Sequence, residues 1–464
     1  MQGGISGNKN EYVFKEMPVA KALLSFAFPA IVSQIVLLAY NLADTYFLGR
    51  TANPFMIAAV SLVLPLYNVC ISISNLFGTG GGTLIARLLG AQNHAEARRV
   101  SAFSVVASVV ASGAFSLVVW AFNDPLLRLL GASDETLGFA TEYVFWILIL
   151  GGIPAVLSMT MVNLARNAGL AKEAGIGAAG SGILNILLDP LFMFVLLPPG
   201  REVAGAAIAT FVTNLCTVVY FAVLFRMNRE QSVLRALSRS LPSRSSVASI
   251  ISVGIPAALT YFLYDLTTIV IDKLTALHGD IPLAAIGIVM KAERLPLNIC
   301  IGICLGMCPL VGYNFAAKNF ARMKKIYGTA QLSGLAIAAC CIVGYLVFAG
   351  QIMAAFIAEP ETVSLGTTFL RVRCFAPLMM FACFNFVMFF QAVGMGRHAL
   401  VFAIIRQVVF NIPLLFLLDG LFGLMGIVWT QFLADGITAL ISYAVFRQVA
   451  RRTWDSDLSR TGSA

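Results

Sequence analysis

The chain has 464 residues, of which 59% are hydrophobic and only 11% are charged, and its formal net charge is +9. Soluble proteins are about 45–50% apolar and about 25% charged, so this composition excludes a soluble enzyme and a disordered chain. The basic excess would suit a nucleic-acid partner only if it gathered on one face, but the Lys and Arg residues fall in short segments between apolar runs. We therefore expect lipid, and not nucleic acid, around much of the surface.

Long apolar segments follow one another along the whole chain. A bilayer core about 30 Å thick needs about 20 helical residues, and backbone groups in lipid must be bonded within their own segment, which favours helices. The predicted spans are residues 21–48, 54–86, 97–122, 138–163, 173–197, 203–226, 246–272, 283–312, 326–349, 363–392, 398–418 and 422–446. We expect an all-α polytopic membrane protein with about twelve transmembrane helices.

Lys and Arg are divided unequally between the two sets of loops. Twenty lie in or beside the amino-terminal segment, the loops after even-numbered spans and the carboxyl-terminal tail, whereas the opposite loops hold only Arg50, Arg128, Arg201 and Lys273. This positive-inside pattern predicts that both termini are cytoplasmic. No small-residue cleavage site follows the first apolar run, so we expect that run to be retained in the inner (cytoplasmic) cell membrane.

The two halves of the chain repeat each other. At an offset near 226, Leu89–Val100 aligns with Phe315–Ile326, and a nearby offset aligns Phe28-Pro29-Ala30 with Ile255-Pro256-Ala257. Each half holds six spans, so the repeats share one orientation and suit alternating access between two lobes. The expected parts are a cytoplasmic segment 1–20, an N-lobe 21–226, a cytoplasmic linker 227–245, a C-lobe 246–446 and a cytoplasmic tail 447–464.

Neither the cysteines nor the glycines indicate a bound cofactor. Cys300, Cys304 and Cys308 share one face of a predicted helix, but no Cys-x-x-Cys spacing occurs, so we interpret them as small buried hydrophobes and not as a soft-metal site. The glycine-rich Gly78–Gly82 lacks the Lys-Ser/Thr of a phosphate-binding loop, which favours a close helix contact or a hinge. With no ATP site visible, we expect no cofactor and a secondary transporter.

Several motifs together resemble the multidrug and toxic compound extrusion (MATE) family. They are Asn41–Thr45 in the first span, Ala165–Gly169 leading to Leu184–Leu191 in the fifth, Gly205–Thr210 in the sixth and Pro309–Asn314 in the second half. The resemblance covers nearly the whole chain. It implies two six-helix bundles in a V, a monomer, and cation-coupled export of drugs and other organic, often cationic, compounds.

The same resemblance, carried over residue by residue, implies a cation or proton site in the N-lobe. Its members are Asp44, Asn185, Asp189 and Thr210. A second family pattern places acidic residues in the seventh and tenth spans. Here Asp265 lies in the seventh span, one position from the family's pattern, as a second acidic site, and the tenth span carries no carboxylate.

The residues themselves support a charged site. A carboxylate in mid-bilayer is costly unless it is protonated or paired, so Asp44 and Asp189 are functional candidates, with a permanently protonated structural partner as the alternative. Asn185 precedes Asp189 by four residues and shares its helix face, where it serves either ligation or helix packing. Pro190 withdraws the usual partner of the Ile186 carbonyl, which makes either a ligand oxygen or a packing kink.

These oxygens could hold either Na⁺ or a proton, because oxygen ligands alone do not choose between the two. Our hypothesis is that ion entry from outside neutralises the site and lowers its affinity for a cationic substrate, so that ion and substrate compete for one state.

A substrate cavity that accepts varied compounds needs aromatic, soft or polar walls. The candidates are Gln34, Tyr40, Asn41, Tyr261, Tyr264, Met380 and Phe384.

Two other functions fit parts of the sequence. A flippase for lipid-linked oligosaccharides would use basic residues in its spans, and Arg371, Arg373 and Arg406 keep that reading open. A membrane-embedded enzyme is disfavoured because the three histidines lie far apart in the sequence and no catalytic motif occurs.

Overall fold

The computed structural model describes residues 11–51, 53–227, 233–235, 237–238 and 240–455, without the side chains of Tyr261, Asp265 and Asp455. Within these residues the regular structure is entirely helical. Ten helices are long and apolar enough to cross a membrane, and two bent helix pairs raise the number to as many as twelve. The expected all-α architecture with about twelve spans is confirmed.

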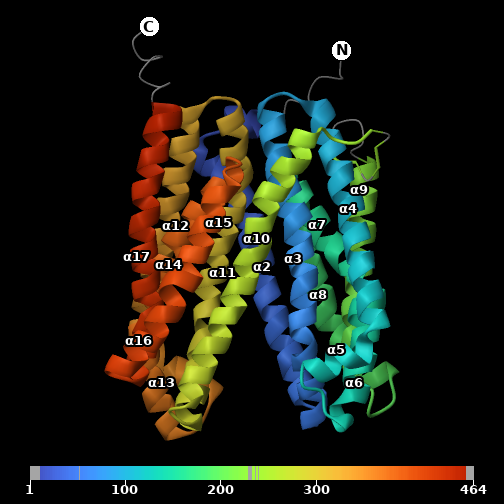
Figure 1. Ribbon diagram of the computed structural model, residues 1–464, viewed down its shortest axis with the longest axis vertical. Helices are drawn as coiled ribbons and strands as arrows, with labels where there is room; N and C mark the ends of the chain where they lie inside the picture. The colour runs from blue at the N-terminus through green and yellow to red at the C-terminus, as the bar shows by residue number, and fades with distance from the viewer. Residues whose placement is uncertain (1–10, 52, 228–232, 236, 239, 456–464) are drawn as a thin grey trace. The chain divides into compact units, whose positions relative to one another are not determined.

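The elements follow each other in two similar series (Figure 1). The first comprises α2 (Val19–Gly49), α3 (Pro54–Gly90), α4 (His94–Ala121), α5 (Asn123–Leu129), α6 (Asp134–Val144), η1 (Phe145–Leu150), α7 (Gly152–Asn167), α8 (Ala171–Leu191), η2 (Phe192–Leu196) and α9 (Glu202–Met227). The second comprises α10 (Arg244–Ala276), α11 (Asp280–Ala316), α12 (Phe320–Phe356), α13 (Pro360–Arg373), α14 (Ala376–Ala392), α15 (Gly396–Ile404), η3 (Ile405–Asn411), α16 (Ile412–Phe422), α17 (Leu424–Ala450) and η4 (Arg451–Asp455).

Two spans that we predicted as continuous helices are bent. The fourth bends by 50° between Asp134–Leu150 and Gly152–Asn167, and the tenth bends by 43° between Pro360–Arg373 and Ala376–Ala392. In each, a proline lies in the first turn of the second segment, Pro154 in α7 and Pro377 in α14. Proline lacks an N–H donor and is tolerated in a first turn, where that donor has no helical partner, so each helix restarts there.

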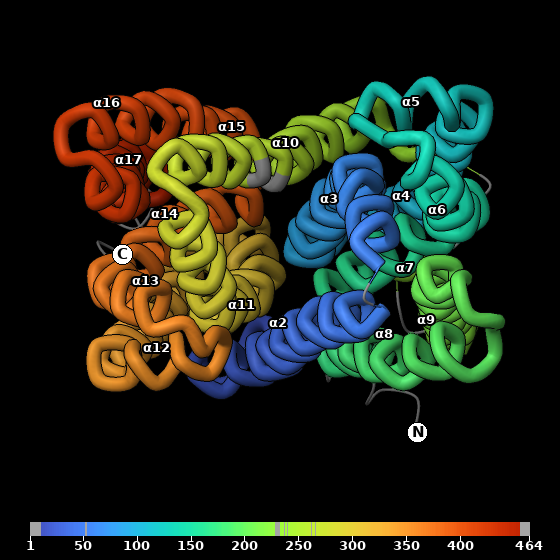
Figure 2. The backbone as a smooth tube through the Cα atoms, turned by 90° about the horizontal axis from the view of Figure 1, so that it is seen from below, coloured from blue at the N-terminus to red at the C-terminus, as the bar shows by residue number. Residues whose placement is uncertain are grey.

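The two series pack in the same way, as the repeat requires. In the first, α3 packs on α4, α6 and α7, and α8 packs on α9; in the second, α11 packs on α12, α13 and α14, and α16 packs on α17. Figure 2 shows α3 beside α4 and α7, and α11 beside α12 and α13. The correspondence extends to the backbone, because Gln92 and Lys318, which are 226 residues apart, have positive φ angles of 58° and 57°.

Each compact unit of the structure contains the first part of a helix whose remainder belongs to the other unit. One unit contains residues 1–16 and 32–258, and the other contains residues 17–31 and 259–464. The chain therefore passes from one unit to the other within α2 and again within α10. Pro29 lies inside α2 and Pro256 inside α10, and each stands two residues before the point where its helix changes unit.

Each exchanged segment packs tightly on a long helix of its unit. In the first unit a Cβ atom added to Gly80 of α3 would lie 2.4 Å from the Ile250 carbonyl oxygen, and one added to Gly254 would lie 2.1 Å from that of Leu76. In the second unit a Cβ atom on Gly306 of α11 would lie 2.5 Å from the Ala27 backbone. The close helix contact that we predicted at Gly78–Gly82 is confirmed, because only glycine allows backbones this near.

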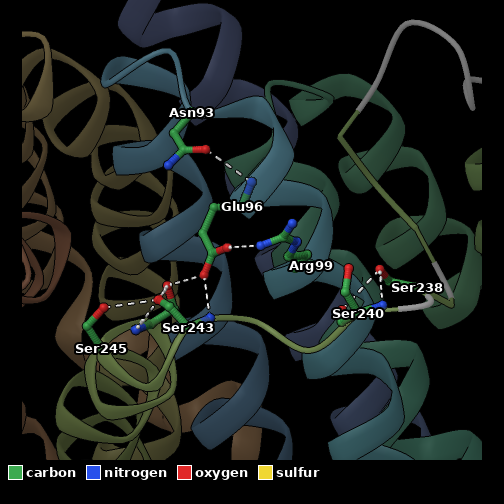
Figure 3. Close-up of polar contacts among 8 residues, drawn as sticks. Asn93, Glu96, Arg99, Ser238, Ser240, Ser243 and Ser245 are labelled. Carbon is green, nitrogen blue, oxygen red and sulfur yellow. Dashed lines mark hydrogen bonds and ion pairs between the residues drawn. The ribbon is translucent and has the colours of Figure 1, made fainter.

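Polar contacts hold the ends of the exchanged segments at equivalent positions. The Glu96 carboxylate at the start of α4 accepts from the Ser243 backbone N–H and the Ser246 hydroxyl, both at 2.7 Å, next to the start of α10 (Figure 3). Arg322 stands 226 residues later, at the start of α12, and donates to the Met17 carbonyl at 2.6 Å. The starts of α4 and α12 thus each hold the incoming helix segment of their own unit.

Candidate functional site

The predicted N-lobe residues come from three helices of one unit. Asp44 lies on the second part of α2, Asn185 and Asp189 lie on α8, and Thr210 lies on α9. The spacing of four places Asn185 and Asp189 on one face of α8, as expected.

A glycine contact holds α9 against the end of the helix before it. A Cβ atom added to Gly205 would lie 2.8 Å from the Met193 backbone in η2. Thr210 stands five residues further along α9, so this contact helps to fix its position relative to α8.

A hydrogen bond joins two of the four residues. The Asn185 side-chain N–H donates to the Thr210 hydroxyl at 3.2 Å, and both groups are buried. This bond uses the amide nitrogen, so the Asn185 carbonyl oxygen is left for another ligand.

Three buried oxygens of this cluster accept no hydrogen bond from the described residues. They are the Asn185 Oδ1 atom and both carboxylate oxygens of Asp189, which is only 1% exposed. Burying an unpaired charged carboxylate costs several kcal/mol, so the group needs either a proton or a cation. An oxygen set of this kind suits a hard cation such as Na⁺ as well as a proton.

Asp44 is the second carboxylate of the predicted cluster. Its side chain is partly exposed, and its carboxylate lies near enough to disfavour the ionised form of Asp189. No described Lys or Arg forms an ion pair with either carboxylate. Two neighbouring acids without a basic partner can exchange a bound ion more readily than a closed ion pair can.

Pro190 lies inside α8, where we predicted either a ligand oxygen or a packing kink. The helix continues as the π-helical turn η2, and the span as a whole runs from Ala171 to Leu196. The backbone therefore changes from α-helical to π-helical shortly after Asp189. Such π-helical turns are frequent at functional sites in other proteins.

The substrate cavity candidates are divided between the two units. In the first, Tyr40 is partly buried and lies one helical turn before Asp44 on α2, and Gln34 is also partly buried. Asn41 is exposed, and its side-chain N–H donates to the Leu37 carbonyl of the same helix at 2.9 Å. Tyr40 is thus the candidate that shares a helix face with Asp44.

In the second unit, Tyr264 and Met380 line one pocket together. The Phe384 ring lies 5.0 Å from the Arg406 guanidinium, so this aromatic face is already occupied by a cation of the protein. The side chains of Tyr261 and Asp265 lie outside the described residues, so the second acidic site remains a prediction.

Two buried ion pairs in the second unit were not predicted. Arg373 of α13 donates to both carboxylate oxygens of Glu293 on α11, each at 2.9 Å. Arg406 of η3 donates to Asp435 of α17 at 2.5 and 3.2 Å. Glu293 and Asp435 lie in predicted spans, and an ionisable residue in an apolar span is the signal that could have marked them.

The pairing also changes how the arginines are interpreted. Arg373 and Arg406 are both buried and neutralised by a carboxylate, whereas Arg371 is exposed. Two of the three residues that kept a flippase reading open are therefore structural partners of acids.

The comparisons with known proteins agree on one family. The MatE family model matches residues 29–191 and 256–417. The multidrug export protein MepA of Staphylococcus saprophyticus is 32% identical over 94% of this chain and 95% of its own, and that of Staphylococcus haemolyticus is 32% identical over 95% and 96%. The family match falls once in each half of the chain.

Solved structures share the fold at lower identity. A multidrug resistance MATE family transporter of the MOP superfamily, in an outward-facing conformation, gives a TM-score of 0.89 at 22% identity and covers 95% of this chain and 97% of its own. A MOP superfamily transporter from Pyrococcus furiosus gives a TM-score of 0.88 at 22% identity and covers 96% and 99%, and its structure is described as having a binding pocket of reverse polarity.

Proposed function

Because the chain belongs to the MatE family of transporters, we propose that it is a secondary multidrug exporter that expels organic, often cationic compounds in exchange for H⁺ or Na⁺. The relatives that match it over nearly the whole chain are named multidrug export proteins. The observation that carries the coupling is the set of unpartnered buried oxygens on Asn185 and Asp189, beside the carboxylate of Asp44.

The proposed cycle follows from the charge of this cluster. With both acids ionised, the cluster attracts a cationic compound that enters from the cytoplasm. A proton or Na⁺ that arrives from outside takes the same oxygens and cancels the attraction, so the compound leaves outward. The ion and the compound have opposite effects on one equilibrium, and this difference in affinity is what exchange requires.

Position in the cell is part of the same proposal. We propose an inner (cytoplasmic) membrane location with both termini in the cytoplasm, because twenty Lys and Arg lie beside one set of loops and four beside the other. A lipid-linked oligosaccharide flippase is less well supported, since Glu293 and Asp435 neutralise two of the arginines that would bind pyrophosphate.

The test is transport by purified protein in vesicles, with a pH gradient or a Na⁺ gradient imposed separately. One gradient should drive accumulation of a cationic dye and the other should not. Asp44→Asn and Asp189→Asn should each abolish that drive while the protein still inserts and elutes as a single species. Glu173→Gln is the matched control, because Glu173 lies on α8 outside the cluster. Undiminished coupled transport by both Asp variants would contradict the proposal.

A further inference from the structure

A basic groove lies at the carboxyl-terminal end of α17 and in η4, within the second unit and apart from the carboxylate cluster described above. It is an open hollow of about 400 Å³, lined by Ala444, Arg447, Gln448, Arg451 and Arg452. The three arginines are exposed, and none forms an ion pair with any side chain that the structure describes. The groove therefore presents three positive charges, and the Gln448 amide adds a further donor.

A buried aromatic side chain fixes the backbone that carries these arginines. Trp454 of η4 is fully buried, and its ring centroid lies 5.8 Å from that of Phe389 on α14 and 6.0 Å from that of Phe446 on α17. Arg451 and Arg452 lie between Phe446 and Trp454 in the sequence. Their backbone positions are thus set before any ligand binds, which lowers the entropic cost of binding.

An exposed apolar stripe on α17 leads to the groove. Leu433, Ile437 and Leu440 are exposed and follow each other at intervals of four and three residues, so they share one helix face. The next positions on that face are Ala444 and Arg447, which line the groove. The apolar face of the span therefore continues directly into the basic groove.

Tyr443 lies where the stripe meets the groove. Its side chain is exposed, and the Arg447 guanidinium lies 5.9 Å from its ring centroid. Tyrosine is enriched where the apolar interior of a bilayer meets the headgroups, and arginine side chains near the ends of spans extend toward those headgroups. This end of α17 is thus suited to hold its arginines at the depth of lipid phosphates.

We propose that the groove binds the headgroup of an anionic phospholipid, whose acyl chains lie along Leu433, Ile437 and Leu440. Phosphate oxygens accept charged hydrogen bonds from guanidinium groups, and basic pockets at the cytoplasmic ends of spans bind such headgroups. A choline headgroup would bring its own positive charge to the three arginines, so the groove should discriminate against it. The site goes beyond the proposed export and does not involve the coupling residues.

Lipid binding is measured by native mass spectrometry of the purified, delipidated protein in detergent. Dioleoylphosphatidylglycerol and dioleoylphosphatidylcholine have the same acyl chains and are titrated separately. The apparent dissociation constant of the first bound lipid is determined for each. The wild type should bind phosphatidylglycerol at least about tenfold more tightly than phosphatidylcholine.

The variants remove the charge of the groove. The triple variant Arg447→Gln, Arg451→Gln, Arg452→Gln should lose the preference for phosphatidylglycerol. Each single substitution should weaken phosphatidylglycerol binding about fivefold, as expected for one basic residue at an anionic surface, and should leave phosphatidylcholine binding unchanged.

The matched control removes the same charge from elsewhere on the same predicted side of the membrane. It is the triple variant Arg98→Gln, Arg226→Gln, Arg397→Gln, at exposed sites on α4, α9 and α15. This control should keep the wild-type ratio of the two dissociation constants. An equal loss of preference in the control overturns the proposal, because binding would then follow overall charge and not the groove.

The remaining outcomes also decide. Arginines that only stabilise the end of a helix would leave the lipid preference of the groove variant unchanged, and that result overturns the proposal. If the groove variant does not elute as a single species, wild-type phosphatidylglycerol binding in all three single variants overturns it instead. Ammonium glycerol phosphate carries the phosphate without acyl chains and should give no adduct at the same concentrations. An adduct of equal affinity that the groove variant lacks would show a site for free phosphate and overturn the assignment to a lipid.

Discussion

The two polar atoms of the Asn185 side chain have different surroundings. Its N–H group bonds to the Thr210 hydroxyl at 3.2 Å, and its Oδ1 atom has no partner among the described residues. The bond to Thr210 therefore fixes which atom of the amide faces the site. Without it the amide could rotate, and its donor nitrogen would face the proposed ion in place of its oxygen.

Removing the Thr210 hydroxyl should weaken ion binding. We expect Thr210→Val to raise the concentration of the coupling ion needed for half-maximal transport about tenfold, because an unsatisfied buried donor costs about 1–3 kcal/mol. The measurement is dye efflux from vesicles at graded external pH or Na⁺. Thr210→Ser retains the hydroxyl and should behave like the wild type; an unimpaired Thr210→Val, or a Thr210→Ser as impaired as Thr210→Val, would contradict the role of the hydroxyl.

The N-lobe candidates could be named from the sequence because an acid in an apolar span stands out and the resemblance supplied the rest; their role in coupling stays a prediction. Glu293 and Asp435 stand out in the same way, but their partners could not be read from the sequence. Arg373 lies 80 residues from Glu293 in the sequence, and Arg406 lies 29 residues from Asp435. Each arginine is on a different helix from its acid, so only the packing of the helices brings the two side chains within hydrogen-bond distance. The sequence therefore indicated free basic residues where the structure has ion pairs.

Helices α3 and α10 approach each other through two glycines, each against a carbonyl oxygen of the other helix. Gly80 faces Ile250, and Gly254 faces Leu76. A backbone carbonyl cannot turn aside as a side chain can, so a methyl group at either position forces the helices apart. The glycine-rich stretch predicted a close contact here, but the sequence could not name α10 as the partner, because α10 belongs to the other repeat.

Gly80→Ala and Gly254→Ala should therefore lower the thermal midpoint of the detergent-solubilised protein by several degrees, since overpacking costs about 1–3 kcal/mol. Gly180→Ala is the matched control. Gly180 is also helical but has no atom within 4 Å of an added Cβ, so the control should be neutral or slightly stabilising. The thermal midpoint is measured as the temperature at which half of the monodisperse elution peak is lost. Midpoints equal to that of the wild type for both variants would contradict the contact.

At the scale of the whole molecule, most of the few basic residues in the predicted outer loops contact an acidic or aromatic partner. Arg128 pairs with Asp134 at 3.0 Å, Arg201 pairs with Glu142, and the Arg50 guanidinium lies 5.9 Å from the Phe194 ring. The loops on the other side carry most of the Lys and Arg. The positive-inside bias depends on the number of Lys and Arg and not on net charge, so these partners leave it unchanged, and it opposes translocation of the Lys- and Arg-rich loops across the membrane.

Cysteine labelling tests this orientation. Glu135 lies in the first turn of α6 and Arg98 lies near the start of α4, and both side chains are exposed. A membrane-impermeant maleimide should label Glu135→Cys in intact cells and Arg98→Cys only in inverted vesicles. The unmodified chain is the control. Its exposed Cys216 and Cys340 lie within apolar spans, where lipid disfavours the reactive thiolate. Labelling of Arg98→Cys in intact cells would reverse the predicted topology, and the proposed direction of ion entry with it.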